Sequence, residues 1–225
     1  SVTAYLPSST LAAVVIVAAS SLFDWASVAR LWRMSKVEAS LSIVAFLGVA
    51  AIGVLEGIVV AIALSFVAFV HEAWQPYRTE LGRRPGVRGY HDRARHPDSA
   101  RIPGIVIVRF DAPLFFANGG MFDDYIRSVV EGAGDDVHTV ILAAEPITDI
   151  DTTAVDELLE LDDFLASRGT TLIIAEMKGP VKDQLRRYDL YERFEDRFAP
   201  TTGAAVDAVT GEFRGDIGPD GVDTK

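Results

Sequence analysis

The chain divides into two parts by the pattern of its apolar positions. From Leu11 to Phe23 and from Ala39 to Val70 almost every residue is apolar or small, and the longer run contains one charged residue, Glu56. As a single helix the longer run would extend about 48 Å, against a hydrocarbon core of roughly 30 Å. It is too long for one membrane pass and rather short for two. We therefore predict two short helices that turn within residues 53–57.

The charges that flank this run predict its orientation. Basic residues precede it at Arg30, Arg33 and Lys36, and others follow it at Arg78, Arg83, Arg84 and Arg88. If both clusters obey the positive-inside rule, both ends of the run face the cytosol and the number of passes is even. Between the two apolar stretches, residues 25–36 have the amphipathic pattern of a helix at the membrane interface, with Trp25 and Trp32 at headgroup level.

Two features of the longer run have alternative interpretations. Gly53 and Gly57 have the GxxxG spacing of a helix-packing face, and they also suit the turn of the hairpin. Glu56 is an intramembrane acid with a functional role such as proton coupling, or it lies in the turn, where it meets water. A water-soluble hairpin would need more covering surface than the other ~140 residues offer once they have built their own core.

After Trp74 the pattern changes to alternating strands and helices. Pro76, Gly82, Pro85 and Gly86 are typical of a linker. The following segments predict strands at 104–110, 137–144 and 171–175, and helices that begin at Asn118-Gly-Gly, at Thr152, at Gly179-Pro180 and near Thr202. Strands that alternate with helices indicate an α/β domain with a mixed, mostly parallel sheet flanked by helices.

These patterns predict four segments. They are all-α transmembrane helices at 1–75, a linker at 76–86, an α/β domain at 87–210 and a disordered tail at 211–225. Charge supports the division, because residues 1–86 have six basic and five acidic residues, whereas residues 87–225 have 15 basic and 27 acidic. An acidic second part argues against nucleic acid as a partner, since phosphate binding needs clustered Lys and Arg.

Composition excludes several kinds of chemistry. The 225 residues include no cysteine, so disulfides and thiolate chemistry are absent. The histidines lie in separate segments without the spacing of metal ligands. We find no arrangement of Ser, His and Asp and no paired carboxylates that predict catalysis, and we expect neither an enzyme nor a cofactor. The acidic pairs Asp123-Asp124 and Asp162-Asp163 are interpreted as solvated helix faces.

Several stretches carry a resemblance to a known family. They read IPGIVIVRFDAPLFFAN at 102–118, EPITDIDTTA at 145–154 and RGTTLIIAEMKGPVKDQL at 168–185. The apolar part adds Asp24-Trp25 and Leu31-Trp32-Arg33, followed by a glycine-containing run. In this order and spacing the pieces resemble the C-terminal end of the SulP sulfate permeases, in which the last membrane helices precede a STAS domain.

The resemblance implies an electrochemically driven carrier of sulfate, bicarbonate, dicarboxylates or related anions in a cell membrane. It implies a cytoplasmic STAS domain for regulation and a homodimer with contacts through the final helices and this domain. In that family the substrate site lies earlier in the protein, so no substrate-binding residue is expected here. The alternative is a membrane-anchored signalling module, in which the STAS domain binds a kinase or a sigma-factor regulator.

The loop at Asp149 to Ala154 is the main candidate site. STAS domains resemble bacterial anti-sigma-factor antagonists, in which a Ser or Thr after an Asp in this loop accepts phosphate, and this position corresponds to Thr152, with Asp151 before it and Thr153 after it. A phosphate at a helix N-terminus would meet unpaired N–H groups. The alternative is plain helix capping by these side chains. The resemblance also raises nucleotide binding, although no glycine loop of the phosphate-cradling kind supports it.

Overall fold

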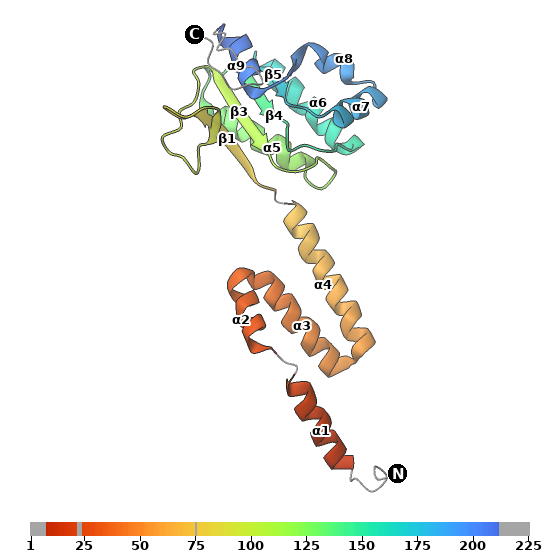
Figure 1. Cartoon of the computed structure of the whole chain (residues 1–225). Coiled ribbons are helices and arrows are strands. Elements are labelled where there is room, and N and C mark those ends of the chain that lie inside the picture. Colours follow the sequence, from red (N-terminus) through yellow and green to blue (C-terminus); the bar gives the residue numbers. More distant parts are fainter. Residues whose placement is uncertain (1–7, 22–23, 75, 212–225) are drawn as a thin grey trace. The chain divides into compact units, whose positions relative to one another are not determined.

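A computed structural model describes residues 8–21, 24–74 and 76–211 (Figure 1). The chain forms two compact units that divide between His71 and Glu72, and each is described by itself. The predicted disordered tail, apart from Gly211, lies outside the described residues.

The first unit consists of helices. They are α1 (Ser8–Ser21), α2 (Trp25–Met34), α3 (Lys36–Ile52) and α4 (Val54–Trp74). Local capping separates α2 from its neighbours: the Asp24 carboxylate accepts hydrogen bonds from the N–H groups of Ala26 and Ser27 at 2.9 and 3.1 Å, and the Ser35 hydroxyl accepts from Glu38 at 3.2 Å. Such oxygens satisfy N–H groups that have no partner within the helix, so each helix begins where the cap stands.

The predicted break of the long apolar run is confirmed at Gly53. This residue separates α3 from α4 and has a φ of 121°, a conformation that glycine adopts at little cost. Glu56 lies in the first turn of α4 and is exposed. Gly57 is buried against α3, where an added Cβ would lie 2.6 Å from the Cα of Val49. Of the two predicted roles, Gly53 therefore makes the turn and Gly57 packs the helices together.

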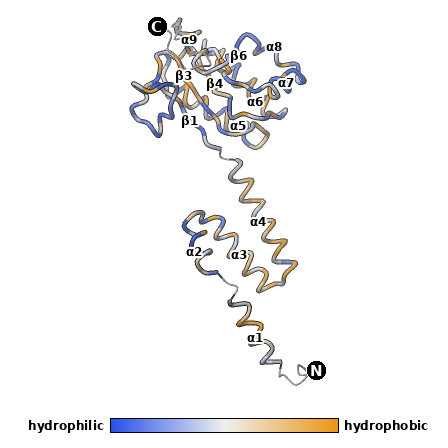
Figure 2. Tube along the Cα trace, viewed as in Figure 1, coloured by the Kyte–Doolittle hydropathy of each residue, from blue (hydrophilic) through white to orange (hydrophobic). Residues whose placement is uncertain are grey.

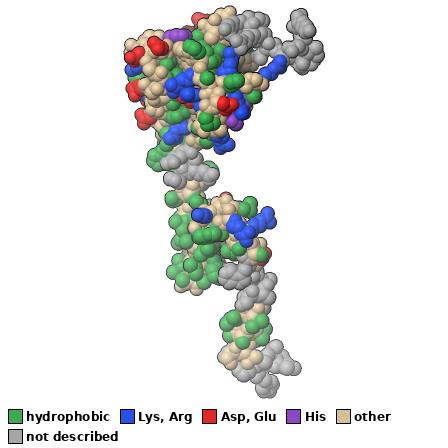
Figure 3. Space-filling model, turned by 90° about the vertical axis from the view of Figure 1, so that its left-hand side faces the viewer, with side chains coloured by type: hydrophobic (Ala, Val, Ile, Leu, Met, Phe, Trp, Pro, Cys, Tyr) green, Lys and Arg blue, Asp and Glu red, His purple; other side chains and the backbone are tan. Residues whose placement is uncertain are grey.

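Hydrophobic residues dominate the helices of this unit (Figure 2), and apolar side chains lie on its surface in the view of Figure 3. In α1 and α4 many valines, leucines and phenylalanines are more than half exposed, for example Val17 at 69%, Leu55 at 73% and Phe69 at 67%. Within the described part of the chain, no helix is both long enough and apolar enough to cross a membrane.

The second unit is an α/β domain, as predicted. Its sheet has the order β2-β1-β3-β4-β5-β6. The first three of these strands pair antiparallel and the rest pair parallel. The strands are β1 (Arg78–Arg83), β2 (Tyr90–Asp92), β3 (Ile105–Phe110), β4 (Thr139–Ala143), β5 (Thr171–Ala175) and β6 (Phe198–Ala199). The three strands predicted from apolar runs are β3, β4 and β5.

The linker predicted at 76–86 is wrong for residues 78–83, which form β1 inside the sheet. β1 pairs with β3 on one side and with β2 on the other, and its Thr79 and Leu81 side chains are 4% and 5% exposed. Pro85 and Gly86, which suggested a linker, belong to the connection from β1 to β2. The strand escaped prediction because it is short and only two of its side chains are deeply buried, so its pattern carried little apolar signal.

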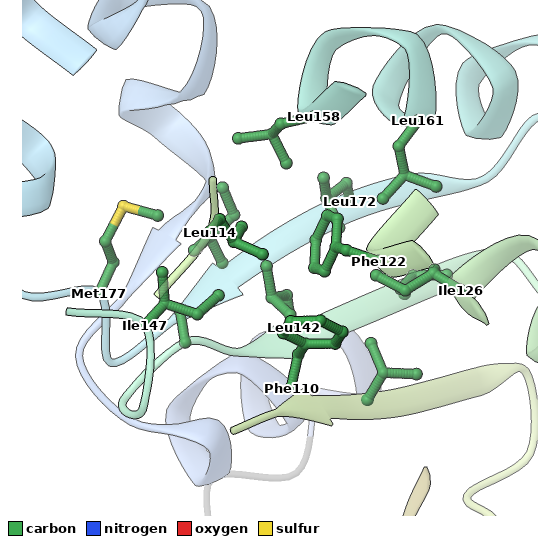
Figure 4. Close-up of a cluster of buried hydrophobic side chains, with 14 of the residues drawn as sticks. Phe110, Leu114, Phe122, Ile126, Leu142, Ile147, Leu158, Leu161, Leu172 and Met177 are labelled. Carbon is green, nitrogen blue, oxygen red and sulfur yellow. The ribbon is translucent and has the colours of Figure 1, made fainter. Parts of the chain in front are cut away.

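Helices cover the two faces of the sheet unequally. One face packs against α5 (Gly119–Ala133), α6 (Thr152–Ser167), α7 (Gly179–Arg187) and α8 (Tyr191–Phe194), and this side holds the larger core. Its centre includes Phe110 and Phe122, whose ring centroids lie 5.4 Å apart in an edge-to-face arrangement (Figure 4). On the opposite face the described part of the chain supplies one helix, α9 (Thr202–Thr210), which packs through Ala205 and Val206.

Asp162 is not the solvated acid that its pairing with Asp163 suggested. It is 4% exposed and accepts hydrogen bonds from Arg193 at 2.8 Å and from Arg197 at 2.5 Å. Burial alone would raise its pKa, but the two guanidinium groups outweigh burial and lower the pKa. Asp123 is likewise buried, at 7%, and pairs with Arg127. Asp162 therefore ties α6 to Arg193 and Arg197, and Asp123 pairs within α5, so neither acid faces water.

Candidate functional site

The Asp149–Thr153 loop lies at the carboxyl end of β4, where it is bound to the connection between β3 and α5. The N–H of Leu114 donates to the carbonyl of Asp149 at 3.0 Å, and the N–H of Asp151 donates to the carbonyl of Leu114 at 3.1 Å. Leu114 and Ile150 form a parallel bridge, and their side chains are 2% and 0% exposed. The loop is thus an ordered extension of the sheet with apolar side chains anchored in the larger core.

Asp151 is the residue that caps α6. One carboxylate oxygen accepts from the N–H of Ala154 at 2.8 Å, and the other accepts from the N–H of Phe116 at 2.8 Å. A single side chain therefore satisfies a helix N-terminus and fastens the neighbouring loop to it. Asp151 is therefore the capping residue. Thr152 and Thr153 do not cap the helix, because they are already its first two residues.

Thr152 and Thr153 are presented on the surface. Both side chains are exposed, and they stand at the N-terminus of a 16-residue helix. An N-terminus of this kind stabilises negative charge through its N–H groups and the helix dipole. Exposed acids surround the position, namely Asp149 and Asp156, and they would repel an added phosphate at short range. The geometry gives access to a modifying enzyme or a partner, in a markedly acidic setting.

Asp149 connects the same loop to α7. Its carboxylate oxygen accepts from the Gln184 side-chain amide at 2.5 Å and from the N–H of Ile150 at 3.0 Å. The loop therefore has fixed contacts on two sides, to Leu114 and Phe116 in the β3–α5 connection and to Gln184 of α7. Such an arrangement presents the two threonines in one defined geometry.

Phe116 is a surface feature beside this loop that the sequence analysis missed. Its side chain is 73% exposed and its ring lies edge to face against Phe115 at 5.6 Å. The buried Asn118 holds the Phe116 turn: its Oδ1 accepts from the N–H of Phe115 at 2.9 Å and its Nδ2 donates to the carbonyl of Pro113 at 2.9 Å. In the sequence, the feature that could have indicated it is the pair Phe115 and Phe116 in the loop that follows a predicted strand.

Gly119, at the start of α5, serves packing. A Cβ on Gly119 would lie 3.1 Å from the Cγ of Glu157 and 3.3 Å from the Cα of Ala154, so α5 and α6 approach closely here. Burial, followed by the charges of Glu160 and Asp123, raises the pKa of Glu157. An acidic, closely packed helix pair offers no cradle for a phosphate group at this point.

The described residues contain no cluster of three or more His, Cys, Asp or Glu side chains placed to hold a metal ion. Glu56, the acid of the apolar run, lies in the first unit, and the Asp151 loop lies in the second.

Comparisons with known proteins agree with this architecture. The model of the STAS domain family matches residues 96–205, and the model of the sulfate permease family matches residues 1–45. A probable sulfate transporter of Mycobacterium tuberculosis is 34% identical over 206 residues, which cover 91% of this chain and 37% of that protein. Sulfate transporter 1.1 of Arabidopsis thaliana is 33% identical over 185 residues, or 79% of this chain and 28% of that protein.

Solved structures give the same fold. The murine Solute Carrier 26 family member A9 anion transporter, in the inward-facing state, superposes with a TM-score of 0.74 at 20% identity, covering 81% of this chain and 30% of that one. At this identity the likeness concerns the fold alone. The chain spans about a third of the length of the relatives that it matches.

Proposed function

The chain belongs to the sulfate permease family and carries a STAS domain, and from this premise we propose that it is the C-terminal part of a secondary active transporter of sulfate or a related inorganic anion. The observation that carries the proposal is the match to a probable sulfate transporter across 91% of the chain, including both the helical unit and the α/β unit. The relatives are transporters and not enzymes.

We place the first unit in a cell membrane, as part of a multi-pass domain. The large apolar surface of α1, α3 and α4 supports this placement. Exposing that surface to water costs free energy, whereas lipid or other membrane helices would cover it. Trp32 and Trp74, 48% and 52% exposed, lie near helix ends, where tryptophan suits the interface. The basic residues before α3 and after α4 favour a cytosolic position for both ends of the hairpin.

The second unit is then a cytoplasmic regulatory domain in a homodimer. Its separate core, formed by β1 to β6 and the helices α5 to α9, supports a domain that keeps its own structure while contacting other parts of the transporter. An acidic surface suits the cytosol and disfavours nucleic acid. Binding of a nucleotide or of a regulatory protein here would adjust transport without taking part in it.

The Asp151 loop is our candidate for that regulation. Two exposed threonines at the N-terminus of α6, next to the exposed Phe116, favour a surface that accepts phosphate or contacts a partner. The same observation supports the second candidate function, a membrane-anchored signalling module whose STAS domain binds a kinase or a sigma-factor regulator. Phosphopeptide mapping of protein purified from its native cells tests modification at Thr152 and Thr153. Unmodified peptides under all growth conditions would contradict the phosphate-acceptor role.

Glu56 is proposed as a functional acid of the membrane part. It is exposed on the isolated unit at the first turn of α4, where a neighbouring helix or water would meet it in the whole transporter. Glu56→Gln should alter the pH dependence of uptake if the carboxylate moves with a proton, whereas an unchanged profile would leave it as a residue of the turn.

Uptake of radiolabelled sulfate by the full-length protein in liposomes tests the transport function. We expect saturable uptake that depends on an ion gradient and is reduced by competing anions, with a panel of bicarbonate, dicarboxylate and sulfate giving the preference. Removal of the STAS domain should lower uptake or the amount of protein at the membrane. Absence of uptake of every anion, together with specific capture of a purified kinase or sigma-factor regulator, would favour the signalling module.

A further inference from the structure

A hollow opens on the face of the sheet that α9 covers. It has a volume of about 1020 Å³ and its floor includes Leu81 of β1, Arg109 of β3 and Ala143 of β4. The loop from β1 to β2 forms one wall, and the first turn of α9 forms another. The hollow lies beside α9, the single described helix that packs on this face of the sheet.

Arginines gather on the β1–β2 side of this hollow, in a unit that is otherwise acidic. Residues 78–101 have seven arginines and three acids, whereas residues 102–211 have nine basic and 21 acidic residues. The hairpin is thus a local basic region, and its Arg83, Arg84 and Arg88 all line the hollow.

Most of the charged groups in the lining already have partners. Arg84 pairs with Asp98 at 2.5 Å and Arg109 with Asp111 at 2.7 Å. On the acidic side, Glu145 lies 3.4 Å from the Lys178 ammonium. The Glu176 carboxylate accepts from the N–H of Thr202 at 2.8 Å and from its hydroxyl at 3.2 Å.

Three charged side chains of the lining are uncommitted, meaning that they form no ion pair or side-chain hydrogen bond within the described part of the chain. They are Arg83 and Arg88, for which no ion pair or side-chain hydrogen bond occurs, and Asp207 of α9. Arg83 ends β1 opposite Tyr90, and Arg88 lies two residues before Tyr90 in the same connection. The two guanidinium groups therefore belong to one short hairpin, and they outnumber the single uncommitted carboxylate.

We propose that this hollow binds a tetrahedral oxyanion such as sulfate, held by Arg83 and Arg88. Guanidinium groups donate paired N–H groups in a planar fork that suits oxyanions, and charge-assisted bonds of this kind are the strong ones. Sulfate is named because of the proposed transport function, on which this choice of ion rests. The hollow would then let the regulatory domain sense the ion that the membrane domain moves.

Equilibrium dialysis of the whole chain in detergent against radiolabelled sulfate tests the site, at an ionic strength fixed with sodium chloride. We expect saturable binding close to one ion per chain. Arg83→Gln and Arg88→Gln should each weaken it by roughly tenfold. Arg187→Gln is the matched control, because it removes one exposed arginine of α7 outside the hollow and should leave the affinity unchanged.

A second variant tests the sign of the interaction. Asp207→Asn removes the uncommitted negative charge and should tighten binding, whereas a cation site in the same hollow would bind more weakly after this change. Circular dichroism of each variant shows whether the fold is kept. Competition with inorganic phosphate distinguishes a sulfate site from a general oxyanion site, and either result supports the oxyanion class.

Two results would overturn the inference. One is absence of saturable binding, and the other is an equal loss of affinity in Arg88→Gln and Arg187→Gln, which would mean diffuse attraction to net charge. Sulfate uptake by full-length Arg88→Gln protein is a separate readout. If Arg88→Gln loses sulfate binding but keeps uptake, the site lies outside the transport path. If the unaltered protein binds sulfate but shows no uptake, the transport function is refuted and the binding site is not.

Discussion

Deleting strand β1 should remove most of the stability of the α/β unit. Two fragments make the comparison: residues 76–211, which contain β1, and residues 87–211, which begin where the sequence pattern alone placed the domain. In the structure four residues of β1, Arg78 to Leu81, pair with β3, and the opposite edge pairs with β2. The shorter fragment loses both sets of pairs.

The expected loss follows from the contacts of β1. Burial of Leu81, 5% exposed, contributes about 2 kcal/mol. Each backbone hydrogen bond that pairs β1 with β2 or β3 adds about 1 kcal/mol. The loss is therefore several kcal/mol, against a total of about 5–15 kcal/mol for a typical domain. Loss of β1 also leaves one edge of β3 unpaired and removes Leu81 from the cluster that contains Ile105 and Ile107.

Urea unfolding followed by circular dichroism measures both fragments without detergent. We expect a cooperative transition for 76–211 and a much lower midpoint, or no folded baseline, for 87–211. Within the longer fragment, Leu81→Ala should cost about 2–3 kcal/mol. The exposed Val87→Ala, in the same hairpin, should stay within about 0.5 kcal/mol. Equal midpoints for the two fragments would refute the placement of β1 in the sheet.

Three further predictions concern the packing of the first unit, a helix cap and a buried acid. Gly57→Leu should destabilise the α3–α4 hairpin, because a side chain would meet the backbone of Val49, and thermal unfolding in detergent should show it. Asp151→Ala should lower the free energy of unfolding of the 76–211 fragment by about 1–2 kcal/mol, whereas Thr152→Ala should change it by less than about 0.5 kcal/mol. Asp162→Asn should weaken the fragment at neutral pH and flatten the decline of its stability in acid, which urea titrations at a series of pH values measure.

The sign of the acid dependence follows from the lowered pKa of Asp162. A carboxylate with a folded-state pKa below its unfolded value stabilises the fold above the unfolded pKa, near 3.8, and this stabilisation is lost as the pH falls through the folded value. Asp92 adds to the same decline, because bonds from Tyr77 and Thr79 outweigh its burial and lower its pKa to about 2. A stability that rises on acidification would contradict both assignments.

The controls for the packing and capping variants come from the same elements. Leu55→Ala lies on the exposed surface of α4, 73% accessible, and should leave the hairpin intact. Gly132→Ala in α5 has no neighbour within 4 Å of the added Cβ and no positive φ, so it should be neutral or slightly stabilising, since alanine is the better helix former. Equal effects of Gly57→Leu and Leu55→Ala would disprove the close approach of α3 and α4.

The sequence by itself determined the two-part organisation and most regular elements. The apolar runs with a single charge indicated helices for an apolar environment, and the strands β3, β4 and β5 followed from β-branched runs because strands buried on both faces need apolar side chains at every position. The helix that begins at Thr152 and the break at Gly53 could also be predicted, since helical period and glycine conformation are local properties.

Tertiary structure decided everything that depends on contacts between distant residues. Strand β1 is held by pairing with β3 rather than by its own apolar content, so its sequence resembled a linker. Asp162 looked solvated beside Asp163, and only the arginines about 30 residues further along the chain bury and bind it. Asp151 shares its two oxygens between a local cap and the distant Phe116. The hollow beside α9 likewise exists only once the sheet, the hairpin and the last helix are assembled, because its floor and its walls come from separate segments of the sequence.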